Sequence, residues 1–311
     1  QVAVLVPTTV LAFQHYKTFA RRLKDFPVKV DYLSRARTAA QTKAVLKGLA
    51  DGQVNIVVGT HKLIGKNVKF KDLGLLVIDE EQKFGVAVKE KLRQIKTNVD
   101  TLTMSATPIP RSLALSLFGD LDVSVIDELP PGRQPVKTRL VPENRRDGLY
   151  DFIRQELKAG RQAYIVCPLV ESCEGKSEKA SATEYYDRLV NGDFRDIPTG
   201  LLYGKLKQSE KEQVMSDFKA GKLKLLVSTT VIEVGVNVPN ATVMMIENAE
   251  RFGLAQLHQL RGRVGRGKYQ SYCIMVNCGD QDGTQKRLDI LNRSNDGFYI
   301  ASEDLKLRGP G

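Results

Sequence analysis

Three carboxylates follow directly after an apolar run in the first third of the chain. The run is Leu75-Leu76-Val77-Ile78, and Asp79, Glu80 and Glu81 come next. Such a run predicts a buried parallel strand, whose end is a costly place for negative charge unless a cation is held there. Carboxylates at the C-terminal end of such a strand handle Mg²⁺ and phosphates in nucleotide-hydrolysing folds. The alternative is an ordinary strand end that leads into a solvated acidic turn.

Three arginines lie close together beside glycines in the second half of the chain. They are Arg261, Arg263 and Arg266, in the stretch from Gln256 to Arg266. Guanidinium groups bind phosphate oxygens in pairs and stay charged, and small neighbours let several of them approach one shared anion. The spacing therefore predicts an anion site, and the alternative is a solvated basic helix.

The elements that must position these groups alternate between short apolar runs and amphipathic stretches. In the first part the predicted strands are Val2 to Pro7, Val28 to Leu33, Val54 to Gly59, Leu73 to Asp79, Thr101 to Ser105 and Val123 to Ile126. The predicted helices between them include Thr38 to Ala50 and Val86 to Thr97. This order predicts an α/β fold with a parallel sheet flanked by helices.

A proline-rich segment interrupts the rhythm between Asp127 and Pro135, which predicts a hinge between two domains. The second part has predicted strands at Val136 to Val141, Gln162 to Leu169, Gly200 to Tyr203, Leu223 to Thr229, Ala241 to Glu247 and Ser271 to Val276. Its predicted helices are Tyr150 to Lys158, Ser209 to Ala220 and Gln285 to Asn292. The polar stretch from Glu171 to Ala182 is predicted to be a mobile loop. The two halves share a rhythm but no detectable repeat of sequence.

Composition narrows the class of protein. The 311 residues carry a formal net charge of +11, which fits a polyanionic partner such as nucleic acid. No apolar run approaches the length of a membrane span, so we expect no membrane association and a cytoplasmic location. The spacing of Cys167, Cys173, Cys273 and Cys278 is not that of a zinc ribbon, and reduced, buried thiols are expected instead.

The arginine and carboxylate segments resemble two motifs of the superfamily 2 helicases. Gln259, Gly262, Arg263 and Arg266 match motif VI, and Asp79-Glu80-Glu81-Gln82 matches motif II, the Walker B box. Other matches follow in the family's order: Pro7-Thr8-Thr9 with Gln14 (motif Ia), Gly59-Thr60-His61 (Ib), Ser105-Ala106-Thr107 (III), Gly204-Lys205 (IV), and Ser228-Thr229-Thr230 through Gly235-Val236-Asn237-Val238-Pro239 (V). The resemblance implies two tandem RecA-like P-loop NTPase domains.

Within this superfamily the chain resembles the bacterial branch of double-stranded DNA translocases that contains RecG and Mfd. The first part, with Phe70 to Leu76 and Glu80 to Val86, looks closer to Mfd, the transcription-repair coupling factor, whereas the part from about Asp127 looks like RecG. The closing segment from Asp304 to Gly311 resembles the start of the translocation motif that both share. A chimera or a divergent member would account for the mixture.

For nucleotide chemistry, the resemblance implies ATP and Mg²⁺ as cofactors. Asp79 would hold Mg²⁺, and Glu80 would orient and deprotonate the attacking water. Arg263 and Arg266 would be arginine fingers on the γ-phosphate, and Gln259 would couple phosphate sensing to closure of the cleft. Gly235 and Asn237 would also contact the nucleotide, although relatives often have Asp at the position of Asn237.

For DNA, the resemblance implies backbone contacts at loop tips, which are largely independent of sequence and sensitive to salt. The residues concerned are Thr8, Thr9, Thr60, His61, Lys62, Gly204, Lys205, Ser228 and Thr229. The alternative for each is an ordinary capping or turn residue. Ser105, Ala106 and Thr107 would relay the nucleotide state between the ATP and DNA sites.

The resemblance also sets the expected domains and partners. It implies an ATP-binding domain at 1–127, a hinge at 128–135, a helicase C-terminal domain at 136–283, and the start of the translocation-motif helices at 284–311. We expect a monomer that acts on duplex or branched DNA in the bacterial cytoplasm near the nucleoid. RNA polymerase would be a further partner if the parent protein were Mfd-like.

One expected element is absent from the sequence. No phosphate-binding Gly-x-x-x-x-Gly-Lys-Ser/Thr sequence occurs in the chain, which also begins inside a predicted strand. We therefore expect an excised piece of the motor core of an ATP-dependent translocase in DNA repair and recombination, inactive as an ATPase on its own. The alternatives are a non-enzymatic basic module that binds nucleic acid, and an RNA helicase.

Overall fold

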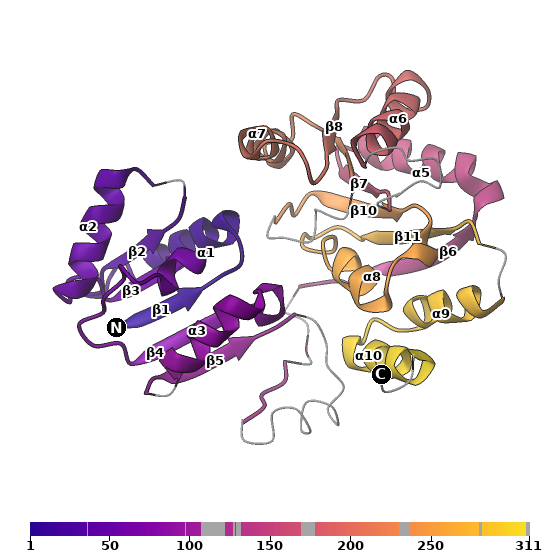
Figure 1. The fold of residues 1–311 in the computed structure, drawn as a ribbon. Coiled ribbons are helices and arrows are strands. Elements are labelled where there is room, and N and C mark those ends of the chain that lie inside the picture. The colour runs from indigo at the N-terminus through magenta and orange to yellow at the C-terminus, as the bar shows by residue number, and fades with distance from the viewer. Residues whose placement is uncertain are drawn as a thin grey trace. The chain divides into compact units, whose positions relative to one another are not determined.

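A computed structural model describes residues 1–35, 37–96, 98–106, 122–126, 128, 132–168, 178–229, 237–279 and 282–308. The chain forms two compact units, Gln1–Ala106 and Thr107–Gly311, and each has its own sheet (Figure 1). The predicted boundary at 127/128 adjoins residues outside the described ranges, so it stays a prediction.

The first unit is built on a parallel sheet of five strands in the order β2-β3-β1-β4-β5. The strands are β1 (Val2–Leu5), β2 (Val30–Leu33), β3 (Ile56–Gly59), β4 (Leu75–Asp79) and β5 (Asp100–Met104). The helices are α1 (Thr9–Arg22), α2 (Ala39–Ala50) and α3 (Val86–Lys96). The predicted parallel α/β sheet is confirmed, as are the two helices that were predicted by their bounds.

Helices cover both faces of this sheet. Ala12 of α1 packs with Val4 and Val58 on one face. Leu49 of α2 and Leu92 of α3 lie in the cluster on the opposite face. The N-terminal end of α2 is stabilised by a local capping interaction. Thr38 caps α2 through a reciprocal pair of hydrogen bonds with Gln41.

The predicted strand from Val123 to Ile126 is wrong. Residues 122–126 form no strand, and the side chains of Val123 and Ile126 are 50% and 93% exposed. Among the described residues, residues 123–126 pair with no neighbouring strand. An apolar run without a neighbouring strand to satisfy its backbone groups gains no ladder of hydrogen bonds, whatever its composition.

The second unit contains a parallel sheet of six strands in the order β6-β11-β10-β7-β9-β8. The strands are β6 (Lys137–Pro142), β7 (Gln162–Val166), β8 (Thr199–Leu202), β9 (Leu225–Ser228), β10 (Ala241–Ile246) and β11 (Tyr272–Asn277). The helices are α5 (Arg146–Lys158), α6 (Glu178–Asn191), α7 (Gln208–Lys219), α8 (Leu254–Arg261), α9 (Asp282–Arg293) and α10 (Gly297–Arg308). Each strand and helix predicted for this half is present, with shifts of a few residues at the ends.

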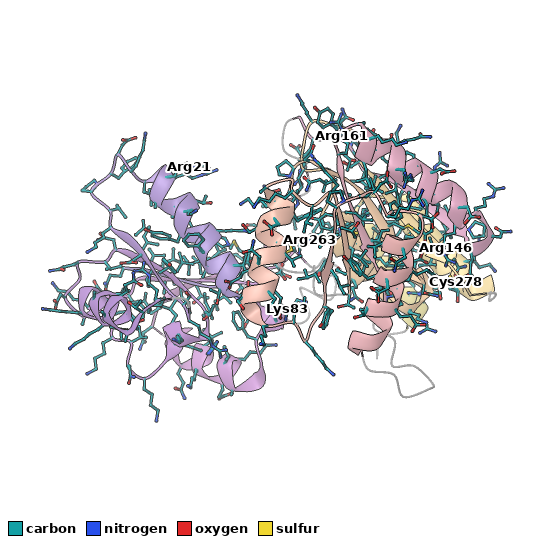
Figure 2. All side chains as sticks on the ribbon, turned by 90° about the horizontal axis from the view of Figure 1, so that it is seen from above. Arg21, Lys83, Arg146, Arg161, Arg263 and Cys278 are labelled. Carbon is teal, nitrogen blue, oxygen red and sulfur yellow. The ribbon has the colours of Figure 1, made fainter. Side chains whose placement is uncertain are left out.

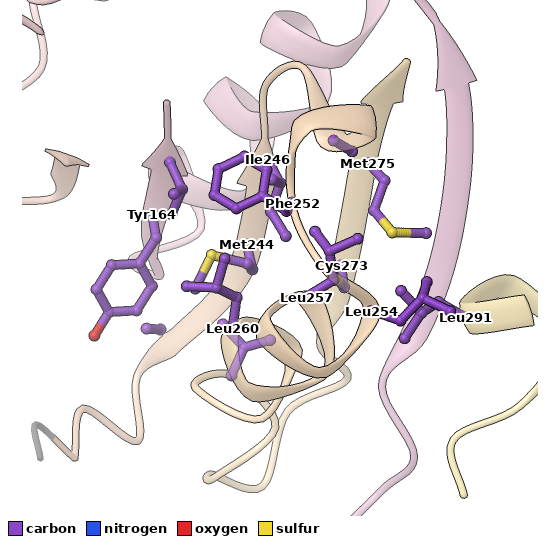
Figure 3. Close-up of a cluster of buried hydrophobic side chains, with 14 of the residues drawn as sticks. Tyr164, Met244, Ile246, Phe252, Leu254, Leu257, Leu260, Cys273, Met275 and Leu291 are labelled. Carbon is purple, nitrogen blue, oxygen red and sulfur yellow. The ribbon is translucent and has the colours of Figure 1, made fainter. Parts of the chain in front are cut away.

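The core of the second unit also has two layers. Ile153 of α5 and Leu189 of α6 pack on one face of the sheet. Phe218 of α7, Leu257 of α8 and Leu291 of α9 pack on the other face, part of which is shown in Figure 3. The sheet therefore carries helices on both sides, as the order of elements predicted.

Two further expectations can be compared with this unit. Residues 178–182 of the predicted mobile loop belong to α6, so that part of the prediction is wrong, and 171–177 lie outside the described residues. The prediction rested on the polar composition of this stretch. It did not take into account that alanine and glutamate are good helix formers. Cys167 and Cys273 are buried and not in a disulfide, as predicted. Over the described residues, the longest apolar helices fall short of what crossing a bilayer demands.

Candidate functional site

The motif loops of the first unit meet at one edge of its sheet. The strands are parallel, and Leu5 pairs in register with Gly59 and Ile78, while Asp79 pairs with Met104. The loops that follow β1, β3, β4 and β5 therefore leave the sheet at the same carboxyl edge. In open α/β sheets this edge is where ligands bind.

Asp79 is the last residue of β4 and faces a histidine from α1. The Nε2 atom of His15 lies 3.3 Å from Oδ2 of Asp79, and the side chains are 27% and 19% exposed. Carboxylate oxygens are the ligands that Mg²⁺ prefers, usually one or two from the protein together with substrate phosphates. No cluster of three or more ligating side chains occurs among the described residues. Asp79 thus fits a metal that is shared with phosphate rather than one held by a protein cage.

Glu80 has an unusual backbone conformation next to this carboxylate. Its φ and ψ are 54° and 52°, in the left-handed region that costs a non-glycine residue free energy. Its N–H donates to the carbonyl of Met104 at 2.9 Å, and its Oε1 accepts the N–H of Ala106 at 3.3 Å. Motif II is therefore hydrogen-bonded to the loop after β5, which contains Ser105 and Ala106. Thr107 lies outside the described residues.

The predicted DNA contacts of the first unit lie on the same edge but differ in exposure. The hydroxyl of Thr8 caps α1 by accepting the N–H of Leu11 at 3.3 Å, and Thr9 is the first residue of that helix. Thr60 is only 4% exposed, whereas His61 and Lys62 are exposed. The two exposed side chains are the groups most available to a phosphate backbone.

In the second unit, the two arginines of motif VI, Arg263 and Arg266, lie just beyond the end of α8. Arg266 donates from Nε to the carbonyl of Gly262 at 3.0 Å. Burial, and then the positive charges of Arg263 and Arg133, lower the pKa of Arg266 to about 10. The charges of both arginines also act on Tyr164 of β7, whose pKa is raised by burial and lowered in part by Arg266 and Arg263. This concentration of positive charge in a partly buried place favours an anionic ligand.

Two glycines of this segment, Gly265 and Gly267, lie where a side chain would not fit. Gly265 has φ of +74°, and a Cβ on it would lie 2.7 Å from a side-chain carbon of Val136. A Cβ on Gly267 would lie 2.2 Å from the carbonyl oxygen of Pro239. Val136 immediately precedes β6, and Pro239 lies two residues before β10, so the segment passes along the amino edge of the sheet. Backbone packing therefore favours glycine at both positions. The expectation that the glycines beside the arginines make room for an anion stays a prediction.

Arg261 does not belong with the other two arginines, which corrects the predicted cluster of three. It is 3% exposed, and its Nη1 donates to the carbonyls of Leu291 and Ser294 at 2.9 and 2.8 Å. Its Nη2 contacts Nδ1 of His258 at 2.8 Å. Burial and then the charge of Arg261 lower the pKa of His258 to about 4, so its ring is neutral and Nδ1 accepts the hydrogen bond. Arg261 joins α8 to α9.

The structure describes two of the three remaining residues that were predicted to contact the nucleotide. Gln259 is a partly exposed residue of α8, close to the helix end that leads to Arg263. Asn237 is exposed and lies shortly before β10. Gly235 falls outside the described residues. Their roles remain predictions.

The predicted DNA contacts of the second unit lie at its carboxyl edge, opposite the edge that Gly265 and Gly267 line. Leu202 and Val166 both pair in register with Ser228, so the loops after β7, β8 and β9 emerge together. Lys205 is exposed, and the carbonyl of Gly204 accepts a hydrogen bond from Lys211. Ser228 and Thr229 are each 1% exposed, and Ser228 donates to the carbonyl of Thr229 at 2.7 Å. Lys205 is therefore the most accessible of the four.

Sequence reasoning missed three residues at these edges. His15 carried no local signal, because its partner Asp79 lies far away in the sequence. Glu247 follows the apolar run of β10 just as Asp79 follows the apolar run at 75–78, so the rule that singled out Asp79 could have found it. Arg133 was treated only as part of the hinge.

Comparison with protein families confirms the resemblance to superfamily 2 helicases. Residues 1–115 match the DEAD/DEAH box helicase family, and residues 145–268 match the helicase conserved C-terminal domain. A solved structure described as RecG bound to a three-way DNA junction superposes with a TM-score of 0.82 at 48% identity, covering 100% of this chain and 40% of that one. The helicase MrfA bound to DNA and AMPPNP shares the fold at 18% identity, with a TM-score of 0.68.

Curated relatives are also similar to this chain over its full length. The ATP-dependent DNA helicase RecG of Thermotoga maritima is 50% identical over 311 residues, and that of Bacillus subtilis is 47% identical over 311. The chain covers 40% and 46% of these two proteins, less than half of their length. The similarity to RecG includes the first half, so the comparisons favour RecG there over the predicted likeness to Mfd, and a DNA helicase over an RNA helicase.

Proposed function

The chain belongs to the RecG-like helicases of superfamily 2, and on this premise we propose that it is the motor core of an ATP-dependent DNA translocase. The observation that carries the proposal is the arrangement at the end of β4. Asp79 is a partly exposed carboxylate there, and Glu80 is hydrogen-bonded to the loop that contains Ser105 and Ala106. A carboxylate suited to a metal and an adjacent base are among the parts that phosphoryl transfer requires.

The roles proposed for the nucleotide site follow from these positions. Asp79 binds Mg²⁺, which when bound neutralises charge on the phosphates. Glu80 orients the attacking water and accepts its proton. Arg263 and Arg266 offset the charge that develops on the γ-phosphate, a role supported by the nearness of the positive charges of Arg263 and Arg133 to Arg266. Gln259, Gly235 and Asn237 make further contacts to the nucleotide.

DNA is proposed to bind at the carboxyl edges of the two sheets. His61, Lys62 and Lys205 are exposed there and supply charge, while Thr8, Thr9, Thr60, Gly204, Ser228 and Thr229 shape the loops around them. Such contacts recognise the phosphate backbone, so binding should weaken with salt and depend little on sequence. Ser105, Ala106 and Thr107 connect DNA binding with the nucleotide site.

Branched DNA is the proposed substrate. The support is the 48% identity with a RecG whose structure contains a three-way DNA junction. Movement along duplex DNA through a junction migrates the branch, and the proposed role is therefore fork remodelling in repair and recombination.

The test uses the product of the full gene that encodes this chain and measures ATP hydrolysis with a three-way junction present. Glu80→Gln and Arg263→Ala should each reduce kcat by about 100-fold or more, because they remove the base and a transition-state charge. Lys268→Ala is the matched control, since Lys268 is an exposed cation of the same segment. Wild-type turnover in Glu80→Gln or Arg263→Ala would refute the assignment.

A second experiment tests the substrate. Three-way junctions, linear duplex DNA and duplex RNA are compared as activators of the same protein. We expect the strongest stimulation by the junction and the weakest by RNA. Equal stimulation by RNA would overturn the proposed substrate while leaving the ATPase roles intact.

A further inference from the structure

The two units contain the same turn after a central strand. In the first unit, the sequence Asp79-Glu80-Glu81-Gln82-Lys83-Phe84-Gly85 connects β4 to α3. In the second, Glu247-Asn248-Ala249-Glu250-Arg251-Phe252-Gly253 connects β10 to α8. The two segments are equally long, begin with a carboxylate and end with a cationic residue followed by Phe-Gly. The expectation of no detectable repeat is thus corrected for this short stretch.

The backbones of the two turns agree closely. Glu80 and Asn248 are the non-glycine residues with positive φ in the described part of the chain, at 54° and 47°. Each precedes a 3-10 helix of three residues, Glu81–Lys83 and Ala249–Arg251. Equivalent hydrogen bonds close the turns, because the N–H groups of Lys83 and Arg251 donate to the carbonyls of Glu80 and Asn248 at 2.9 and 3.0 Å.

The phenylalanines anchor both turns in the same way. Phe84 is 9% exposed and packs in the cluster that contains Ile78 of β4. Phe252 is 3% exposed and packs in the cluster that contains Ile246 of β10 (Figure 3). The similarity therefore includes the packing as well as the path of the chain.

The surroundings of the two carboxylates differ. Asp79 is 19% exposed, and its contact is with His15. Glu247 is 3% exposed and faces the guanidinium of Arg146, whose Nε and Nη2 donate to its two oxygens at 3.2 and 3.0 Å. The hydroxyl of Tyr185 adds a third donor at 2.7 Å. A buried carboxylate needs such a partner, because an unpaired one costs several kcal/mol.

Arg146 also makes contacts outside the turn, which fix the position of its guanidinium beside Glu247. It begins α5, and its Nη1 donates to Glu143 at 3.0 Å. Its Nη2 also lies 3.6 Å from the sulfur of Cys278, the residue next to it in Figure 2. The rest of the turn is fixed as well, since Glu250 accepts the N–H of Cys278 at 3.2 Å and Arg287 donates to the carbonyl of Glu250 at 2.7 Å.

From these contacts we infer that Arg146 is the permanent cation of the second turn, in the place where Asp79 of the first turn is proposed to hold Mg²⁺. The pair Arg146–Glu247 is then a positioning device for α8. It holds the turn from which α8 starts, and so sets where Gln259, Arg263 and Arg266 lie whether or not nucleotide is bound. The inference rests on the proposed role of these arginines in ATP hydrolysis.

The test is chemical rescue in the product of the full gene. Arg146→Ala removes the cation and leaves space beside Glu247. We expect kcat for ATP hydrolysis to fall by about 10-fold, with little change in KM, because misplaced arginines weaken contacts to the transition state. Low-millimolar guanidinium chloride should restore several-fold of the lost kcat, whereas the same concentration of sodium chloride should not.

Arg154→Ala is the matched control. Arg154 also lies on α5 and is paired to a carboxylate, Asp196, at 2.8 Å, but that carboxylate is 54% exposed and far from the turn in sequence. Its loss should leave kcat unchanged, with no effect of guanidinium. A folded Arg146→Ala protein with wild-type kcat, or with a low kcat that guanidinium does not raise, would overturn the inference.

A second variant covers the case in which Arg146→Ala fails to fold. Replacing the pair with Arg146→Met and Glu247→Met removes both charges together, which buried ion pairs often tolerate. The inference expects this protein to fold and to hydrolyse ATP slowly, and wild-type turnover would exclude it. If instead the proposed role of the arginines in ATP hydrolysis were wrong, Arg263→Ala would also retain its ATPase activity, and this result distinguishes the two cases.

Discussion

The imidazole of His15 contacts the carboxylate of Asp79 at 3.3 Å, and so connects α1 with the end of β4. The same helix is capped by Thr8, a predicted DNA contact. His15 thus links the loop expected to bind DNA with the carboxylate expected to bind Mg²⁺. Residues that orient a metal ligand in this way control metal affinity more than the chemical step.

Replacing His15 should therefore raise the concentration of Mg²⁺ needed for ATP hydrolysis. For His15→Ala we expect an increase of about 10-fold in the Mg²⁺ concentration at half-maximal rate, with recovery of most of the activity at saturating Mg²⁺. His15→Gln, which can still donate to the carboxylate, should shift the curve less. The measurement is a Mg²⁺ titration at fixed ATP, and Lys17→Ala, an exposed residue of the same helix, is the control. Superimposable Mg²⁺ curves for His15→Ala and the wild type would contradict this role.

Arg261 and Arg263, two residues apart, should separate into a structural and a functional arginine. Arg261→Met removes hydrogen bonds to one buried and one partly buried carbonyl and should destabilise the protein by about 2–4 kcal/mol. Arg263→Met should change stability by less than about 1 kcal/mol and abolish most of the ATPase activity. Chemical denaturation and steady-state turnover of both variants provide the comparison. A stable but inactive Arg261→Met would show that the assignment of the two arginines is reversed.

Much of the fold could be predicted because most of the interior strands of the two sheets are apolar along nearly their whole length. The runs at 75–78 and 241–246 are examples, and the carboxylate after the first of them pointed to the site. Arg261 was misassigned, although its position carried a signal. It follows Leu254 and Leu257 at helical spacing, which places it on the buried face of α8.

Other features depend on contacts between distant parts of the chain. His15 and Arg146 become informative only when the sheet brings Asp79 and Glu247 beside them. The repeated turn escaped sequence reasoning because only Phe and Gly are identical in the two segments. Val123 and Ile126 show the opposite case, in which an apolar run lacks a neighbouring strand and remains exposed.

The left-handed residue of the second turn should be sensitive to substitution. Asn248→Ala should destabilise the protein by about 1–2 kcal/mol, because a Cβ without a polar group is strained at φ of 47°. Asn248→Gly also loses the side-chain contact to Glu250 but has no such strain, so it should be clearly more stable than the alanine variant. Denaturant unfolding of the two variants isolates the backbone effect. Equal stability of the alanine and glycine variants would argue against strain at this position.

His258 should make stability depend on pH. Burial and the charge of Arg261 lower the pKa of His258 from 6.5 to about 4 in the folded protein. Between these values the unfolded chain binds a proton that the folded chain does not, so stability falls as pH decreases from about 6.5 toward 4. The shift corresponds to roughly 3 kcal/mol once the pH is below both values.

His258→Asn tests this dependence, because the asparagine oxygen can still accept the hydrogen bond from Arg261 but does not titrate. Carboxylates titrate in the same range in both proteins, so the informative quantity is the difference in unfolding free energy between the wild type and the variant. We expect this difference to be constant above about pH 7 and to move in favour of the variant as the pH falls toward 4. A difference that stays constant over the whole range would mean that His258 titrates alike in the folded and unfolded chains, and its neutral hydrogen bond to Arg261 would then be excluded.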